Sequence, residues 1–144
     1  MKFDRITEDS LRFLLRAFYE KIRHDPQLAP VFAATIGGRW DAHIARMCSF
    51  WGSAMGSSTR YKGDMLAAHK RINRLSPALF ERWLKLFDET VREHFVGEPA
   101  EALRDRARKT ARNLRLALFH PIDEVCSAAM VVRNDASGAG PAHA

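Results

Sequence analysis

The chain has 144 residues, of which 47% are hydrophobic and 28% are charged, a balance that favours one globular domain and excludes a disordered chain. The net charge is +6, but acidic residues are interleaved with the basic ones, which is typical of solvated helix faces and disfavours a nucleic-acid surface. Two distant cysteines, an N-terminus without a secretion signal and the lack of an apolar run of about 20 residues favour a cytoplasmic protein over a secreted or membrane protein.

The spacing of apolar residues is helical along almost the whole chain, and the first helix is expected from Thr7 to Asp25. Thr7 suits the N-cap position. The apolar stripe of this helix follows the helical period and consists of Leu11, Leu14, Leu15, Phe18 and Ile22. Tyr19 lies on the edge of this stripe. Asp25-Pro26 predicts the end of this helix and the start of a short second one, because proline suits a first helical position. The pair Gly37-Gly38 ends that second helix.

A third helix is expected from about Arg39 to Met55. Its predicted apolar stripe consists of Trp40, Ile44, Met47 and Trp51. His43 and Phe50 flank this stripe, so His43 is expected to face inward or nearly so. Residues 52–63, which overlap the end of this helix, contain few helix formers at their centre and predict a loop.

Three more helices are expected in the second half of the chain. A short one over Asp64–Ile72 carries His69, and Ser76-Pro77 begins the next with a serine cap and a first-turn proline. The apolar face of that next helix consists of Phe80, Trp83, Leu84, Phe87, Val91 and Phe95. Gly97 and Pro99 are expected to separate it from a last long helix, which His120-Pro121 ends.

The prediction is therefore an all-α protein. No alternation of apolar and polar residues between hairpin turns indicates a strand. One domain is expected over residues 1–120. Residues 121–144 are expected to form an extension that is partly helical and then disordered, because its end is rich in Gly, Ala, Ser and Pro.

Local motifs exclude several metal and nucleotide sites. The chain has no Glu-x-x-His pair of a di-iron bundle, and neither the His-Glu-x-x-His of a zinc hydrolase nor a phosphate-binding glycine loop. A haem site needs less: one neutral histidine on the iron, apolar walls and cations near the propionates. Arg60, Lys62 and Lys70 are candidate cations, although each is equally compatible with solvated surface charge.

The order of the aromatic residues and histidines is more specific than any single residue. It runs through Phe18-Tyr19, Pro30-Val31-Phe32, Trp40-x2-His43, Phe50-Trp51, Tyr61-x-Gly63, His69 and Phe80-x2-Trp83-Leu84-x2-Phe87. This order resembles the third group of the truncated haemoglobins over about residues 3–119, and residues 80–87 are its most specific part. The resemblance implies a shortened globin, a two-over-two helical sandwich that encloses haem b.

The resemblance also implies roles for individual residues. His69 looks like the proximal histidine that ligates the iron. The polar distal residues of the family are matched by Tyr19, His43 and Trp83. Further haem contacts are implied or suggested for Phe32, Met47, Phe50, Trp51 and Tyr61, of which Tyr61 is a candidate partner of a propionate. The chain departs from the family pattern at the basic pair Lys70-Arg71 and in the extension after residue 120.

Two functional hypotheses follow. The first is a haem protein that binds dioxygen, nitric oxide or peroxide, receives electrons from an unidentified reductase and exists as a monomer or weak dimer. Hydrogen bonds from Tyr19 and Trp83 to bound dioxygen, about 1.5–3 kcal/mol each, would slow its release about a hundredfold or more. Such retention favours redox chemistry, such as nitric oxide dioxygenation or a peroxidase-like reaction, over transport; whether turnover occurs stays open. The second hypothesis is a cofactor-free basic helical module that binds nucleic acid or a protein partner.

Overall fold

The computed structural model describes residues 1–56, 63–72 and 75–119. In these ranges the chain forms α1 (Glu8–His24), α2 (Ala29–Ile36), α3 (Trp40–Ala54), α4 (Met65–Lys70), α5 (Pro77–His94) and α6 (Gly97–Phe119). Strand-like pairing within these ranges is limited to one bridge between Phe3 and Phe95. The all-α prediction is confirmed, while the expected break at His120-Pro121 and the extension 121–144 lie outside the described residues.

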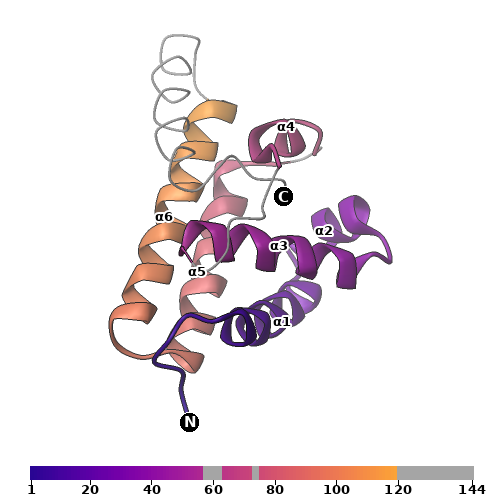
Figure 1. Ribbon diagram of the computed structural model, residues 1–144. Coiled ribbons are helices and arrows are strands. Elements are labelled where there is room, and N and C mark those ends of the chain that lie inside the picture. Colours follow the sequence, from indigo (N-terminus) through magenta and orange to yellow (C-terminus); the bar gives the residue numbers. More distant parts are fainter. Residues whose placement is uncertain (57–62, 73–74, 120–144) are drawn as a thin grey trace.

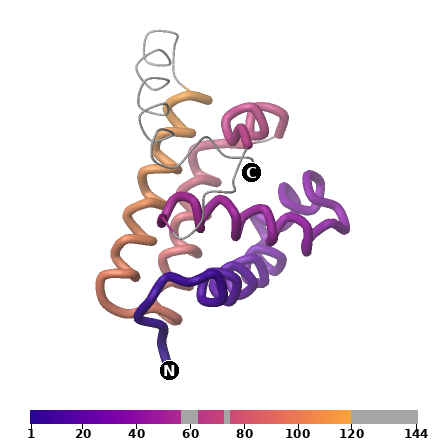
Figure 2. The backbone as a smooth tube through the Cα atoms, viewed as in Figure 1, coloured from indigo at the N-terminus to yellow at the C-terminus, as the bar shows by residue number. Residues whose placement is uncertain are grey.

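Four of the helices form two pairs that cross each other (Figure 1). Helices α5 and α6 lie side by side and run in opposite directions, while α1 contacts both α3 and α5. Helix α2 packs against α1, and the short α4 packs against α6 (Figure 2). This arrangement is the expected two-over-two sandwich. None of the helices in the described ranges has the length and apolar character needed to cross a membrane.

Side-chain caps set the start of three helices, and two of these caps, Thr7 and Ser76, are the ones that the sequence predicts. The Thr7 hydroxyl accepts a hydrogen bond from the Ser10 N–H at 3.0 Å, and the Ser10 hydroxyl accepts one from the Thr7 N–H at 2.8 Å. Asp64 caps α4 through the Ala67 N–H at 3.0 Å, and Ser76 caps α5. These bonds satisfy N–H groups that have no partner inside the helix.

The predicted start of α2 at Pro26 is wrong, because the helix begins at Ala29. The Asp25 carboxylate accepts hydrogen bonds from the backbone N–H groups of Gln27 and Leu28, at 3.1 and 3.0 Å, and holds the intervening residues in a turn. Pro30, not Pro26, therefore occupies the first turn of α2, where a missing N–H costs nothing.

The expected separation of α5 and α6 by Gly97 and Pro99 is also wrong. Both residues lie in the first turn of α6, and the connection consists of Phe95 and Val96. Gly97 has a φ of 71°, a left-handed conformation that glycine adopts without strain. Pro99 follows it where the helix needs no N–H donor.

An aromatic stack joins the two helix pairs. The ring of Phe87, which is fully buried in α5, lies between Trp51 of α3 and Trp83 of α5, with ring centroids 4.8 and 5.4 Å away and interplanar angles of 13° and 7°. Phe18 of α1 meets the same ring edge-on at 5.1 Å. Three helices thus share one aromatic contact, which buries a large apolar area in favourable ring geometries.

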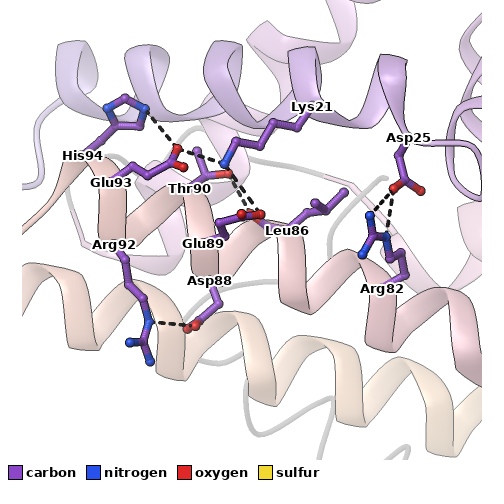
Figure 3. A network of polar contacts seen from close by, with 10 residues as sticks. All are labelled: Lys21, Asp25, Arg82, Leu86, Asp88, Glu89, Thr90, Arg92, Glu93 and His94. Carbon is purple, nitrogen blue, oxygen red and sulfur yellow. Dashed lines mark hydrogen bonds and ion pairs between the residues drawn. The ribbon is translucent and has the colours of Figure 1, made fainter.

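Polar contacts fix α1 and the turn after it against α5 (Figure 3). Oδ1 of Asp25 accepts hydrogen bonds from Nη2 and Nε of Arg82 at 2.6 and 2.8 Å, and Lys21 pairs with Glu93 at 2.8 Å. Asp25 is only 4% exposed. Burial by itself raises the pKa of Asp25, but the hydrogen bonds from Arg82 and from the Leu28 N–H outweigh it and hold the pKa below its usual value.

We expect the substitution Asp25→Ala to lower the free energy of unfolding by about 2 kcal/mol, because it removes the hydrogen bonds that shape the turn and leaves Arg82 without its buried partner. Urea unfolding followed by far-ultraviolet circular dichroism measures the loss. The matched control is Asp4→Ala, since Asp4 is exposed and its removal is expected to change stability by less than about 0.5 kcal/mol. Equal losses in the two variants would contradict the assigned role of Asp25.

The stabilisation by Asp25 is expected to depend on pH. Its pKa in the folded protein lies below the unfolded value of about 3.9, so its contribution is complete above that value and is lost as the pH falls through the folded pKa. The difference in unfolding free energy between the unsubstituted protein and Asp25→Asn should therefore be constant above about pH 5 and shrink below about pH 4. A difference that stays constant down to about pH 3 would show that the charge of Asp25 is not the stabilising feature.

Candidate functional site

A cavity of about 230 Å³ lies within the sandwich and is lined by residues from all six helices. Most of its wall is apolar and consists of Leu28, Val31, Phe32, Ile36, Ala42, Met47, Phe50, Trp51, Met65, Ile72, Leu75, Leu79, Phe80, Ala111 and Leu114. A few polar side chains interrupt this wall. A largely apolar cavity with few polar groups is typical of a site for a small molecule or cofactor.

The fold brings together eight of the nine predicted site residues. They line the one cavity and are Tyr19, Phe32, His43, Met47, Phe50, Trp51, His69 and Trp83. The ninth, Tyr61, lies outside the described residues. Because the eight residues come from α1, α2, α3, α4 and α5, only the folded chain assembles them.

His69 on α4 has its ring fixed by a hydrogen bond within the helix. Its Nδ1 lies 2.7 Å from the carbonyl oxygen of Met65, so Nδ1–H donates and Nε2 keeps a free lone pair. Burial lowers the pKa of His69 and outweighs the opposite effect of the bond to Met65. The imidazole is therefore neutral at neutral pH. A neutral imidazole whose second nitrogen donates to a carbonyl has the form that metal-ligating histidines adopt.

Tyr19 on α1 and His43 on α3 form a pair of polar side chains that line the same cavity. Both are buried, and their rings meet edge-on with centroids 4.9 Å apart. Burial raises the pKa of Tyr19, so its hydroxyl stays protonated and can donate a hydrogen bond.

The Nε2 atom of His43 is buried and makes no hydrogen bond within residues 1–56, 63–72 and 75–119. Burial, followed by the charges of Arg46 and His69, lowers the pKa of His43 to about 4. The ring is therefore neutral at neutral pH. A buried polar nitrogen without a partner costs free energy, and a ligand in the cavity could supply that partner.

Trp83 is half-buried and lines the same cavity from α5. One face of its indole stacks on Phe87, and Phe18 meets the ring edge-on at 5.5 Å. These contacts fix the ring plane. The orientation of this indole N–H donor is therefore set by the core.

The predicted apolar stripe of α3 is confirmed in part: Met47 and Trp51 are buried, and His43 faces inward as expected. Trp40 and Ile44 are half-buried, whereas His43 and Phe50, which the sequence places on the flank, are buried. Three sides of α3 meet α1, the cavity and solvent, so its burial is not a single apolar stripe. The face that lines the cavity is centred on His43 and includes the residues three and four positions from it, Arg39, Arg46 and Met47.

Two arginines that were not predicted from sequence, Arg39 and Arg46, are exposed and line the cavity. They lie four residues before and three residues after His43, so the helical period around that histidine could have found them. Of the cations suggested from sequence, Lys70 does not line the cavity, and Arg60 and Lys62 lie outside the described residues.

Comparison with known proteins agrees with this architecture. No protein-family model matches the chain. The chain is 32% identical over 122 residues to the group 3 truncated haemoglobin ctb of Campylobacter jejuni, and the match covers 83% of this chain and 96% of that protein. The crystal structure of a group III truncated haemoglobin from Campylobacter jejuni matches with a TM-score of 0.79 at 32% identity, over the same shares of both chains. The chain therefore belongs to the group 3 truncated haemoglobins, a family of haem-binding globins.

Proposed function

We propose that the cavity holds haem b with His69 as the ligand of its iron, and that the protein uses it for redox chemistry on dioxygen, nitric oxide or a peroxide rather than for oxygen transport. The observation that carries this proposal is the buried Nε2 of His43, which has no partner in the described part of the chain, on a residue that lines the same cavity as His69. An unpaired donor or acceptor in an otherwise apolar cavity indicates a polar ligand there.

The residues of the cavity fit haem. His69 offers one neutral ring nitrogen, and the wall is apolar and aromatic. Within the described ranges, no group of three or more His, Cys, Asp and Glu side chains could hold a metal ion by itself. A porphyrin, which supplies most of the metal ligands itself and needs one histidine, suits such a cavity.

The rim of the cavity supplies charge for the acidic edge of the cofactor. Arg39 and Arg46 are exposed there, and a guanidinium can bind a carboxylate with two parallel hydrogen bonds. We assign these two arginines, together with Tyr61, as the groups that pair with the propionates.

Haem supplies an iron that binds diatomic ligands and exchanges single electrons. The chain supplies three hydrogen-bonding groups from Tyr19, His43 and Trp83. The protonated phenol of Tyr19 and the core-fixed indole of Trp83 donate to a ligand that gains negative charge, and each such bond contributes about 1.5–3 kcal/mol. A carrier needs rapid release, so a site with this many donors suits reaction of the ligand with electrons from a reductase.

The ligand role of His69 is tested by His69→Ala in the full chain loaded with haem. We expect the Soret band to shift and weaken, and added imidazole to restore much of it, because imidazole can occupy the position of the missing side chain. His24→Ala is the control, since His24 is exposed on α1. An unchanged spectrum in His69→Ala would overturn the assignment. A protein that takes up no haem but binds nucleic acid with steep salt dependence would instead favour the second hypothesis.

The distal donors are tested by the variants Tyr19→Phe, Trp83→Phe and their combination. We expect dioxygen to dissociate about tenfold faster from each single variant, at about 1.4 kcal/mol per decade. Stopped-flow measurement gives the dissociation rate for the unsubstituted protein, the two single variants and the double variant. The free-energy change in the double variant should be smaller than the sum of the two single changes, because both groups bind one ligand. A rate in the double variant equal to that of the unsubstituted protein would contradict the proposal.

A further inference from the structure

We infer that Trp40 and Arg23 form a surface site at which anionic donors each give up one electron, and that the electrons reach the cavity through Tyr19. This inference rests on the proposed function, in the form in which a peroxide is reduced in the cavity. It assigns to this chain a second substrate class and a place for it, separate from the cavity.

Trp40 is the ring directly behind the cavity wall. It is not among the residues that line the cavity, but it contacts three that do. Its ring centroid lies 6.1 Å from that of Tyr19, 6.4 Å from that of Phe32 and 6.5 Å from that of His43. Ring contacts at these distances leave no room for solvent between the cavity wall and Trp40.

The other side of Trp40 reaches the surface. The residue is half-buried, and the guanidinium carbon of the exposed Arg23 lies 5.1 Å from its ring centroid. This is cation–π geometry. The positive charge of this guanidinium therefore lies directly beside the indole. Positive charge at an exposed ring favours approach of an anion.

Tryptophan and tyrosine are the side chains that lose a single electron most readily, whereas phenylalanine and neutral histidine do not. Of the three cavity-lining rings that contact Trp40 in the described part of the chain, Tyr19 is the one that has this property. Tyr19 lines the cavity, and Trp40 meets solvent. The two rings therefore make an oxidisable route from the cavity to this part of the surface.

The proposed reaction balances with a peroxide as oxidant and the anionic donor as reductant. A hydroperoxide takes up two electrons and two protons, its O–O bond breaks, and it leaves as an alcohol and water; hydrogen peroxide gives two waters. Haem bound in the cavity would supply the two-electron chemistry, and Tyr19 and Trp40 would carry the two electrons toward it one at a time. Each donor anion at Trp40 loses one electron, and both protons come from water.

Arg23 would act on this route in two ways. Its charge raises the local concentration of anions at Trp40. It also disfavours positive charge on the indole, so a Trp40 that has lost an electron takes one back more readily from a donor. The first effect selects anionic donors over cationic ones, and the second speeds reduction of Trp40 by any donor.

The first test locates the oxidised ring. The haem-loaded full chain is mixed with hydrogen peroxide and a nitroso spin trap, without donor, and the trapped residues are identified by peptide mass spectrometry. We expect trap on Trp40 in the unsubstituted protein, and none at this position and a lower total yield in Trp40→Phe. The unchanged Soret band and circular dichroism of Trp40→Phe would show that the fold persists.

A control for radicals that diffuse through solution is Phe13→Tyr. Phe13 is half exposed and packs on Phe3 and His94, none of which lines the cavity. The phenol introduced by this substitution is accessible but lacks ring contact with the wall. If the spin trap labelled the introduced phenol to the same extent as Trp40, the inference would be overturned, because the label would then come from radicals in solution.

The second test measures oxidation of ferrocyanide, a tetravalent anion that gives one electron, by hydrogen peroxide and the haem-loaded protein. We expect Arg23→Glu to slow it about tenfold at low salt and less at high salt. The matched control is Arg16→Glu, which makes the same change of charge at an exposed arginine of α1 and is expected to have a smaller effect. Equal slowing by both variants would overturn the site, since net charge would then explain the result.

The outcomes also separate this inference from the proposed function. If hydrogen peroxide leaves the Soret band of the haem-loaded protein unchanged, peroxide chemistry fails and this inference fails with it. If the Soret band changes while Trp40 carries no trap, only the surface site is overturned. Trap on Trp40 together with a specific effect of Arg23→Glu would support both.

Discussion

The stack of Phe87 between Trp51 and Trp83 is the contact on which both the fold and the site depend. It joins α3 to α5, and Phe18 adds α1 from the edge. Both tryptophans also line the cavity. The core and the site therefore share the same side chains, and because a packed interior is stiff, fixing the core also fixes the wall that faces a ligand.

Because the wall is stiff, polar groups of the cavity that have no partner cannot move to find one, and without a ligand they cost free energy. The Nε2 atom of His43 is buried without a partner in the described part of the chain, and the ring of His69 on the same cavity is fixed through its Nδ1 by the carbonyl of Met65. A ligand that satisfies such groups binds the folded state and not the unfolded one, so it stabilises the fold. The aromatic stack and the pair of Asp25 and Arg82 hold the helices in place despite that cost.

Sequence predicted the parts of the fold that depend on local order. Helices α1 and α5 each bury one face and solvate the other, so their period and caps identify them. The start of α2 could not be predicted in this way. Asp25, which shapes the turn before it, is held by Arg82, 57 positions away in sequence, and no local pattern shows that bond. The family resemblance supplied the eight described site residues, but not Arg39 and Arg46, because α3 meets the cavity with a face that an apolar stripe does not mark.

The position of Tyr19 connects retention of a ligand with its reaction. Its ring lies against His43 on the cavity side and against Trp40 toward the surface. A donor hydroxyl holds a small ligand for longer, and a long stay is useful only if electrons arrive before the ligand leaves. A protein that served transport would gain nothing from an oxidisable ring behind this phenol. In the proposed reaction, Tyr19 would both hold the ligand and pass electrons to it, and its contact with Trp40 would couple the two.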